Sequence, residues 1–485
     1  MLNYRIIARA FAGLIGLEGL LFLVCWLVGL GYGETHHSTW YIPIGICAAL
    51  SVILGLLGGK GPTRFERRDG FFIVAMVWLI YCTLGMLPFL FGGHLHRVSE
   101  AFFETMSGFT TTGSTAFTNI DALPHSILLW RSVTHWVGGM GIIFFTLALL
   151  PALGIGEQEL FTAEATGLKL GKLHSRVSTT AHYLWSTYLF VTIACAIAYR
   201  ICGMNTFDAI NHSFAAIATG GFSTHTANIA YFHSPAIEYV SVLFMFLGAT
   251  NFTLLYFVLF KRRFKLFWHD EELRLFILLI FGFTAICTLS QWWHSQDFTE
   301  HGFRESLFYV VSMMSTTGFT TENFMTWPHL TWISLLIVSA IGSCTGSTSG
   351  GIKVVRVLAG IKVVRNEIHH VLHPRSIRPL RINSDYITPE VLQSIFAFLC
   401  CFTVLMVIGV IVFVTLGYPV FDSLGLSISA YSNVGPGIGY SLGPLDSWSE
   451  LPDTGLWLSS FLMIAGRLEI FGLLLPFTPS FWRYN

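Results

Sequence analysis

The sequence predicts an all-α integral membrane protein that consists of two N-terminal spans followed by four pseudo-symmetric repeats of one helical unit. Charged residues are 11% of the 485-residue chain and hydrophobic residues 53%, whereas soluble domains contain about 25% charged residues. The hydrophobic residues form stretches that reach the ~20 residues a helix needs to cross a bilayer. A pattern of acid, small residue and glycine recurs four times. The alternating pattern of a membrane β-barrel is absent from the sequence.

Ten hydrophobic stretches are candidate membrane spans. The first is too long for the ~7–15-residue apolar core of a signal peptide, and a second span follows it directly, so we expect both to be retained. The ten stretches cover residues 6–31, 40–58, 70–91, 125–153, 181–202, 235–260, 273–293, 328–341 with its continuation, 391–416 and 455–477.

The basic residues are distributed unevenly about these spans. With the N-terminus in the cytoplasm and one crossing per span, 22 of the 27 basic residues lie on the inner side, seven of them between Lys353 and Arg381. The positive-inside rule therefore predicts cytoplasmic N- and C-termini. Each basic cluster is short and adjoins a span, which argues against nucleic-acid binding. The nine cysteines form no C-x-x-C pair, and we interpret them as small core residues.

Each repeat is marked by a glycine that follows an acid by 13 residues and a small residue by six. The acids are Glu100, Asp208, Glu305 and Asp422, the small residues are Ser107, Ala215, Ser312 and Ser429, and the glycines are Gly113, Gly221, Gly318 and Gly435. Successive glycines are farther apart than the ~20–50 residues of solenoid repeats. We therefore predict domain-sized units, with an N-terminal pair at 1–60 and repeats at 61–165, 166–265, 266–380 and 381–485.

Each repeat consists of a spanning helix, a shorter helix, a polar loop and a second spanning helix. In the first repeat the shorter helix runs from Glu100 to Phe109, a length of ~15 Å that cannot cross the bilayer. We expect it to enter from outside and end partway, with its acid in the first turn, where the helix dipole favours a negative charge. Irregular backbone at that depth is tolerated only in protein or around a water-filled cavity. The four loops are therefore predicted to meet around one central pore, where four carbonyl-bearing helix ends favour a cation.

Glycine allows the loop carbonyls to turn toward this pore, because it adopts positive φ without a Cβ penalty. Rings of carbonyl oxygens replace the hydration shell of the ion in potassium filters, and the four loop cores contain no carboxylate. A single loop of this kind could equally be an ordinary turn between two helices. Four copies with the same spacing of acid, small residue and glycine argue against that alternative. The predicted filter residues are Thr111, Thr112, Gly113, Thr219, Gly220, Gly221, Thr316, Thr317, Gly318, Asn433, Val434 and Gly435.

A polar, glycine-rich segment interrupts the helix that begins at Trp327-Pro328. The helix breaks after Ile341 and resumes toward Arg365. The break lies below the membrane centre, so we expect the segment to line the pore beneath the filter and to obstruct it. It does not match a phosphate-binding P-loop, because an isoleucine separates its last glycine from Lys353 and no strand precedes it. The predicted gate residues of this segment are Gly342, Thr345, Gly346, Ser347, Gly350 and Gly351.

Arg467 is assigned to the gate as well. It lies within the last span, where a guanidinium costs several kcal/mol unless it faces a cavity or a partner. We expect it to donate to the polar segment, at groups such as Thr345 or Ser347, or to repel cations in the pore. An ion pair with an acid on a neighbouring helix is the alternative.

These motifs resemble those of the TrkH/KtrB superfamily of potassium uptake proteins, and those of TrkH more than KtrB. The resemblance covers nearly the whole chain, and residues 6–58 look like the extra N-terminal pair that separates TrkH from KtrB. Gly113 matches a glycine that is serine in sodium-admitting plant relatives, which indicates a preference for potassium. The matching stretches are Thr110-Thr-Thr-Gly113, Gly220-Gly-Phe-Ser-Thr-His225, Thr317-Gly-Phe-Thr-Thr321, Asn433-Val-Gly-Pro-Gly437, Gly342-Ser-Cys-Thr-Gly-Ser-Thr348 and Gly466-Arg-Leu-Glu-Ile470.

The resemblance implies potassium-selective uptake through a channel-like pore in the bacterial inner membrane, with potassium as the transported ion and no bound organic cofactor in this chain. It implies a homodimer with one pore per subunit, seated on a cytoplasmic ring of TrkA-like subunits that bind NADH, ATP or ADP. It also implies a gate at Gly342–Gly351 with Arg467, and makes Lys353–Arg381 a docking surface for the ring. The chain itself contains no nucleotide-binding motif.

Two other classes of function stay open. A symporter would couple potassium to sodium or protons through intramembrane acids, for which Glu18 and Glu469 are the candidates. A membrane enzyme would need histidine, cysteine or acidic residues clustered near one membrane face, and the sequence contains no such cluster.

Overall fold

The computed structural model describes residues 2–59, 67–141, 177–296, 299–375, 378–383 and 385–483. Over these residues the regular structure is helical, apart from one short antiparallel hairpin of β1 (Arg381–Ile382) and β2 (Asp385–Tyr386). Six described helices are long and apolar enough to cross a membrane, or eight if each of two bent pairs counts as one span. The predicted class, an all-α membrane protein, is confirmed.

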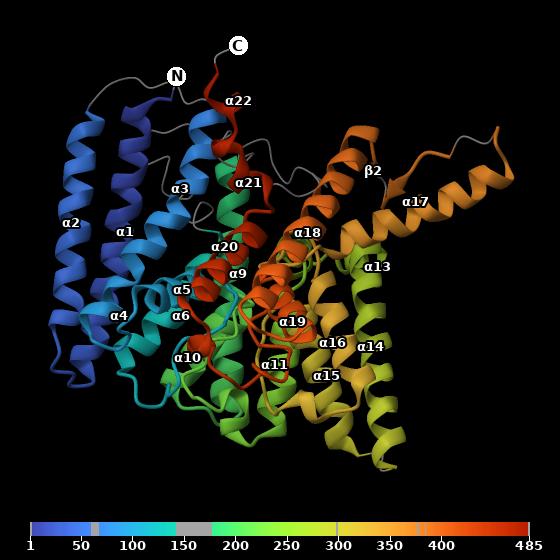
Figure 1. The fold of residues 1–485 in the computed structure, drawn as a ribbon, viewed down its shortest axis with the longest axis horizontal. Helices are drawn as coiled ribbons and strands as arrows, with labels where there is room; N and C mark the ends of the chain where they lie inside the picture. The colour runs from blue at the N-terminus through green and yellow to red at the C-terminus, as the bar shows by residue number, and fades with distance from the viewer. Residues whose placement is uncertain are drawn as a thin grey trace.

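The N-terminal pair is a helical hairpin on one flank of the molecule (Figure 1). It consists of α1 (Tyr4–Gly31) and α2 (Ser38–Gly58). The two helices approach closely because α1 carries Gly19, where a Cβ would lie 3.1 Å from the Cβ of Cys47. Ser51 of α2 donates a hydrogen bond of 2.7 Å to the carbonyl of Ala12. Small residues at a helix–helix contact are typical of membrane helices, which gain little from hydrophobic association in lipid.

The remaining helices follow the predicted order of long helix, short helix and third helix in each repeat. The long helices are α3 (Arg67–Gly85), α9 (Val177–Ile201), α14 (Glu271–Ser295) and α18 (Pro389–Thr415). The short helices are α5 (Val98–Phe109), α10 (Thr206–Ile217), α15 (Glu300–Met314) and α19 (Val420–Tyr431). The third helices are α6 (His125–Gly139), α11 (Pro235–Gly248), α16 (His329–Ile341) and α20 (Asp453–Arg467).

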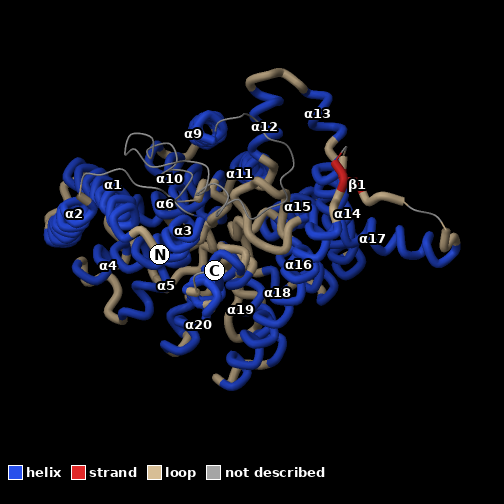
Figure 2. The backbone as a smooth tube through the Cα atoms, turned by 90° about the horizontal axis from the view of Figure 1, so that it is seen from above, coloured by secondary structure: helices blue, strands red, loops and turns tan. Residues whose placement is uncertain are grey.

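Further helices connect or extend these elements. They are α4 (Leu87–Phe91), α12 (Phe252–Leu259), α13 (Phe264–His269), α17 (Val354–Leu372), α21 (Phe471–Leu474) and α22 (Pro479–Trp482), with 3-10 helices at Asn228–Phe232, Phe324–Thr326, Trp448–Glu450 and Leu475–Phe477. The helix α17 projects away from the helical body in both views (Figures 1 and 2). Helix α1 begins and α22 ends on the same side of the molecule (Figure 1).

The core is divided between two large clusters of buried side chains. One joins the N-terminal pair to the helices of the first and fourth repeats, and the other joins the second repeat to the third. Cysteines lie in both clusters, as expected, but Cys400 on α18 is exposed, so its assignment to the core was wrong. Cys400 lies on α18, which is apolar on most of its faces. On such a helix an apolar residue can face outward, so residue type alone does not predict which side chains are buried.

Two predicted spans are sharply bent in the structure. The stretch 235–260 divides into α11 and α12 at 106°, and the stretch 455–477 divides into α20 and a second segment beginning at Phe471 at 109°. The first bend is fixed by Asn251, whose side chain caps α12 by accepting from the amides of Thr253 and Leu254. The second contains Ile470 with φ 65°, which is a strained conformation for a β-branched residue.

Some predictions fall outside the described residues. Of the stretch 125–153, α6 accounts for residues 125–139, and residues 142–153 are not described. The same holds for five of the basic residues that were placed on the cytoplasmic side. They are Lys60, Arg64, Lys169, Lys172 and Arg176.

Candidate functional site

The four short helices end in the same hydrogen-bonded turn. In each one, the residue two positions before the marker glycine has a left-handed backbone, and the amide of the following residue donates to the carbonyl of the small residue five positions earlier. This arrangement is the Schellman motif that closes many helix C-termini. The left-handed residues are Thr111, Thr219, Thr316 and Asn433, with φ of 55°, 51°, 56° and 56°. The amide bonds run from Thr112 to Ser107, Gly220 to Ala215, Thr317 to Ser312 and Val434 to Ser429, at 2.8–2.9 Å.

The marker glycines bring the four loops together in a closed ring. A Cβ at each glycine would fall within 2.0–2.4 Å of a carbonyl oxygen from the next loop. Each of these oxygens belongs to the residue just before the next marker glycine, and the fourth loop closes onto the first. The glycine and oxygen pairs are Gly113 with Gly220, Gly221 with Thr317, Gly318 with Val434, and Gly435 with Thr112.

These glycines are required for two independent reasons. The first is the contact with the neighbouring carbonyl, which leaves no room for a side chain. The second is the backbone, since all four have φ between 76° and 110°, where a side chain is strained. The sequence pattern indicated the second reason but not the first, because contacts between loops have no fixed spacing along the chain.

Side chains of the loops add cross-links within the ring. Asn433 donates from Nδ2 to Thr112 Oγ1 at 3.0 Å and to the carbonyl of Met463 at 2.9 Å, which ties the fourth loop to the first. Ser114 donates to the carbonyl of Gly435 at 2.8 Å across the same junction. The ring is therefore held by side chains as well as by the close backbone packing.

The repeated acids hold the chain that leaves the ring. Asp208 accepts from Thr224 Oγ1 at 2.6 Å, Glu305 accepts from the hydroxyl of Thr321, and Asp422 accepts from the amide of Ser441 at 2.7 Å. Three of the four acids lie in the first helical turn as predicted. Glu305 lies in the second turn, because α15 begins at Glu300 and is longer than the other short helices.

The first repeat departs from this scheme. Glu100 pairs with Arg97 near the surface, and Glu104, one turn further along α5, accepts from the amide of Ala116 at 2.7 Å instead. Glu104 was not among the predicted residues. Its signal in the sequence is its place four residues after Glu100, on the same face of the helix.

His225 lies at the outer edge of the second loop. Its Nδ1 is 2.9 Å from Asp121 Oδ1 and its Nε2 is 3.1 Å from Asp208 Oδ2. Burial lowers the pKa of His225, but hydrogen bonds to Asp208 and Asp121 outweigh this effect and raise the pKa above its ordinary value. The three side chains line a cavity of about 350 Å³ between α10 and the segment from Asp121 to Leu128.

The polar segment between α16 and α17 packs against the ends of the short helices. The amide of Gly350 donates to Thr316 Oγ1 at 2.9 Å. The hydroxyl of Thr348 lies 3.1 Å from Thr219 Oγ1 and 3.0 Å from the carbonyl of Ile217. A Cβ at Gly350 would lie 2.2 Å from the carbonyl of Ser432. The segment therefore contacts the second, third and fourth repeats where their short helices end.

The predicted gate residues occupy different places in this segment. Gly342, Gly346 and Gly351 have positive φ, and a Cβ at Gly342 would lie 2.6 Å from the carbonyl of Gly350. The amide of Thr345 donates to Glu272 Oε1 on α14 at 2.6 Å. The hydroxyl of Ser347 donates to the carbonyl of Cys344 at 2.6 Å.

Glu272 is a second residue that the sequence did not reveal. It is buried at the start of α14 and accepts from the amides of both Thr345 and Val355. It therefore binds Thr345 of the polar segment and Val355 of the first turn of α17 at one carboxylate.

Arg467 joins the polar segment to the first repeat. It donates to the carbonyl of Thr348, to the carbonyls of Gly138 and Gly139 at 2.5 and 3.0 Å, and to Thr111 Oγ1 at 3.2 Å. Arg467 therefore contacts the polar segment as expected, but its acceptor there is the Thr348 carbonyl and not Thr345 or Ser347. The Ser347 hydroxyl is engaged with Cys344, and the Thr345 hydroxyl has no hydrogen-bond partner among the described residues.

The two intramembrane acids have contrasting surroundings. Glu469 forms an ion pair with Arg356 of α17. Glu18 is fully buried in α1, and neither of its carboxyl oxygens has a hydrogen-bond partner in the described part of the chain.

Comparisons with known proteins identify relatives that match nearly the whole length of the chain. The family model TrkH, described as "Cation transport protein", matches residues 36–484. The Trk system potassium uptake protein TrkH of Escherichia coli K12 is 36% identical, over 98% of this chain and 99% of that protein. The Trk system potassium uptake protein TrkG of the same organism is 34% identical, over 99% of each chain.

A solved structure shares the fold. The crystal structure of the potassium transporter TrkH from Vibrio parahaemolyticus superimposes with a TM-score of 0.88 at 34% identity, and the match covers 99% of this chain and 100% of the other. The match of the family model to nearly the whole chain, and full-length relatives above 30% identity, lead to one conclusion: this chain belongs to the TrkH family of cation transport proteins.

Proposed function

We propose that this chain takes up potassium as the membrane subunit of a Trk-type system, and that the ion passes through the ring of four loops. The observation that carries the proposal is the closed contact of each marker glycine with a carbonyl oxygen of the next loop. Such packing brings four equivalent carbonyl groups, one from each loop, around a common axis. Carbonyl rings of this kind bind a cation in place of its water.

The electrostatics of the ring favour a monovalent cation. Each short helix ends at the ring, and a helix C-terminus carries about half a negative charge. The loop residues 110–115, 218–223, 315–320 and 432–437 include no carboxylate. The ion is therefore stabilised by dipoles rather than by full charges, which suits potassium better than a divalent ion.

The polar segment at residues 342–353 is proposed to close the pathway on the cytoplasmic side. Its hydrogen bonds to Thr316 and Thr219 place it directly against the loops. Arg467 holds it there through the Thr348 carbonyl and adds a positive charge that repels cations. Opening would require these bonds to break.

The remaining parts of the proposal concern the assembly. We propose that the protein lies in the bacterial inner membrane with both termini in the cytoplasm, and that the repeats have the boundaries given above. A homodimer on a TrkA-like nucleotide-binding ring is proposed, with the basic region from Lys353 to Arg381 as the docking surface. The projection of α17 from the body supports such a surface (Figure 2).

The proposal is tested by potassium-limited growth of an uptake-deficient bacterium that carries the chain. Serine at Gly113, Gly221, Gly318 or Gly435 should reduce potassium uptake and its discrimination against sodium, because each Cβ collides with a carbonyl of the ring. Serine at Gly45 of α2, where a Cβ has open space, is the matched control. Normal potassium preference in all four ring variants would refute the proposal.

Coupled transport with sodium or protons is the second candidate. Glu18 favours it, because a buried carboxyl group without a hydrogen-bond partner costs free energy unless it is neutral or binds something. Currents through the reconstituted protein distinguish the two candidates. A reversal potential that follows the potassium gradient alone indicates a channel, and one that shifts with the sodium or proton gradient indicates coupling.

A further inference from the structure

The helix α6 carries two side chains that reach the ring from the first repeat. Arg131 and His135 lie one turn apart, and both are buried. Neither was among the residues predicted from the sequence, and neither has a part in the proposed conduction pathway.

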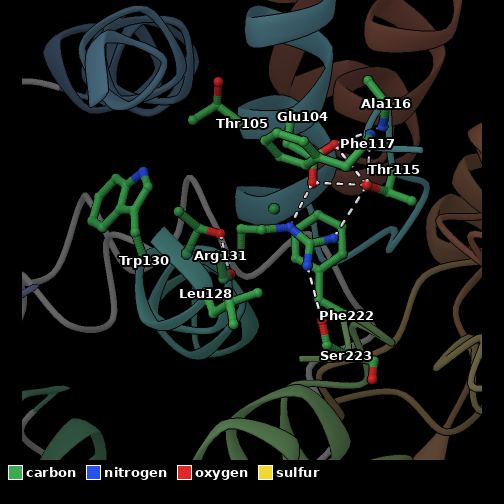
Figure 3. Close-up of polar contacts among 12 residues, drawn as sticks. Glu104, Thr105, Thr115, Ala116, Phe117, Leu128, Trp130, Arg131, Phe222 and Ser223 are labelled. Carbon is green, nitrogen blue, oxygen red and sulfur yellow. Dashed lines mark hydrogen bonds and ion pairs between the residues drawn. The ribbon is translucent and has the colours of Figure 1, made fainter. Parts of the chain in front are cut away.

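Arg131 binds two adjacent loops with one guanidinium group (Figure 3). Its Nε donates to Glu104 Oε1 at 2.8 Å, and a terminal nitrogen donates to Thr115 Oγ1 at 3.2 Å. The other terminal nitrogen donates to the carbonyl of Ser223 at 2.9 Å. Thr115 and Ser223 each lie two residues after a marker glycine, so the guanidinium joins the same position of the first and second loops.

The surroundings of Arg131 make this link rigid. The exposed fractions of the Arg131 and Glu104 side chains are 1% and 0%, so the ion pair is fully removed from solvent. The guanidinium carbon lies 4.1 Å from the centre of the Phe222 ring, which fixes the plane of the group. Buried charge-assisted hydrogen bonds of this geometry are among the strongest in proteins.

His135 joins the same two repeats one turn further along α6. Its Nδ1 lies 2.8 Å from the carbonyl of Gly108, and its Nε2 accepts from the amide of Phe222 at 3.1 Å. This pattern requires the neutral form with the proton on Nδ1. The imidazole also stacks on the Phe222 ring at 4.0 Å.

The equivalent positions of two other repeats lack such a link. The third helices can be aligned by Gly138, Gly248 and Gly466, each of which contacts the carbonyl four residues before a marker glycine. Seven residues before these glycines stand Arg131, Ser241 and Ser459. Ser241 bonds to Tyr199 and Ser459 bonds to its own helix. Among the first, second and fourth repeats, only the first therefore has a charged side chain at this position that joins two neighbouring loops.

We propose that Arg131, paired with Glu104, is a positioning residue that sets the discrimination between potassium and sodium. The inference rests on the proposed function of the ring. A sodium ion is smaller, so the loops must move inward to coordinate it. Arg131 holds the first and second loops at a fixed separation just beyond their marker glycines and so opposes this movement.

The test compares variants by their potassium-to-sodium permeability ratio, measured from reversal potentials of the full-length protein in bilayers. This ratio does not depend on how much protein is active. Arg131→Lys keeps the charge but loses the fork that binds three acceptors at once. The ratio should fall about tenfold, which corresponds to the loss of one hydrogen bond to a charged group.

Two further variants guard against misfolding. The double variant Arg131→Met with Glu104→Gln removes both charges together, so that no buried charge is left without a partner. Thr115→Val removes one acceptor with little change in volume and should lower the ratio to a smaller degree. Arg97→Lys, in a partly exposed ion pair of the same repeat, is the matched control and should keep the wild-type ratio.

Gly113→Ser separates this inference from the function on which it rests. If Gly113→Ser lowers the ratio while the Arg131, double and Thr115 variants keep it, the inference is overturned and the ring remains the filter. If Gly113→Ser and the serine variants at the other three marker glycines all keep the wild-type ratio, the proposed function itself fails. A fall in the ratio in all of these variants, with Arg97→Lys unchanged, supports the inference.

Discussion

Replacing Arg467 by alanine should raise potassium flux through the protein. The reason is that Arg467 donates to the Thr348 carbonyl, and in the proposed gate this bond holds the polar segment closed. Its other bonds reach Gly138, Gly139 and Thr111, which lie outside that segment. Movement of the segment therefore breaks the Thr348 contact and leaves the others in place.

The size of the effect follows from this one contact. A hydrogen bond to a charged group contributes about 1.5–3 kcal/mol, and ~1.4 kcal/mol corresponds to a factor of ten in an equilibrium constant. Loss of the Thr348 contact should therefore raise the ratio of open to closed protein about 10- to 100-fold. The open fraction, and with it the flux, rises by the same factor while the closed state dominates.

The assay is rubidium or potassium flux into proteoliposomes with equal amounts of monodisperse protein. Arg467→Lys is the companion variant, because it retains the charge without the planar donor geometry. If repulsion of the cation matters more than the hydrogen bond, the lysine variant should stay near the wild-type flux. Flux in Arg467→Ala that equals or falls below the wild-type value would refute the gating role.

Three further predictions concern the ring, its support and its outer edge. Gly318→Ala should abolish most potassium uptake, because its Cβ would lie 2.0 Å from a carbonyl oxygen, whereas Gly45→Ala in open space should leave uptake unchanged in the same growth assay. Glu272→Ala should raise basal flux into proteoliposomes, since it frees the two amides that fix the polar segment; a flux at the wild-type level would contradict this. His225 has a pKa above 6.5 in the folded protein, so its pairing with Asp208 stabilises the fold below that value and less as the pH rises through the raised pKa. The melting temperature of wild type should therefore exceed that of His225→Gln most at pH 5.5 and least at pH 9, and a constant difference would count against the pairing.

Features that repeat along the chain could be predicted from the sequence. The acid, small residue and glycine of each repeat recur at fixed offsets, and the structure shows that each has a local cause. The small residue accepts the Schellman bond at the helix end, the glycine needs positive φ, and three of the four acids hold the departing chain. Local hydrogen bonds impose fixed spacings, and fixed spacings are visible in a sequence.

Features that join one repeat to another could not be predicted in this way. Arg131 binds Ser223, 92 residues away, and nothing in the spacing of these two residues distinguishes them from other buried polar side chains. For Arg467 the contact with the polar segment was expected, but its acceptor, the Thr348 carbonyl 119 residues away, was not. The four left-handed residues were assigned to the filter, but their backbone conformation was not predicted, because three of them are threonine and threonine is uncommon at positive φ.

The left-handed residues explain how the ring and the polar segment act as one unit. A helix that ended in glycine at these positions would form the same Schellman turn with less strain. Threonine instead supplies a hydroxyl on the side of the loop that faces the segment. Thr111 accepts from Arg467, Thr219 lies in hydrogen-bond contact with Thr348, and Thr316 accepts from Gly350. Strain at functional positions persists where the surroundings compensate for it. For Thr219 and Thr316 the compensation is a bond to the polar segment itself, which in the proposed gate exists only while the segment is closed. In the proposed gate, opening of the segment therefore also removes support from the ring, so that conduction and selectivity should both depend on the hydroxyl groups of Thr219 and Thr316.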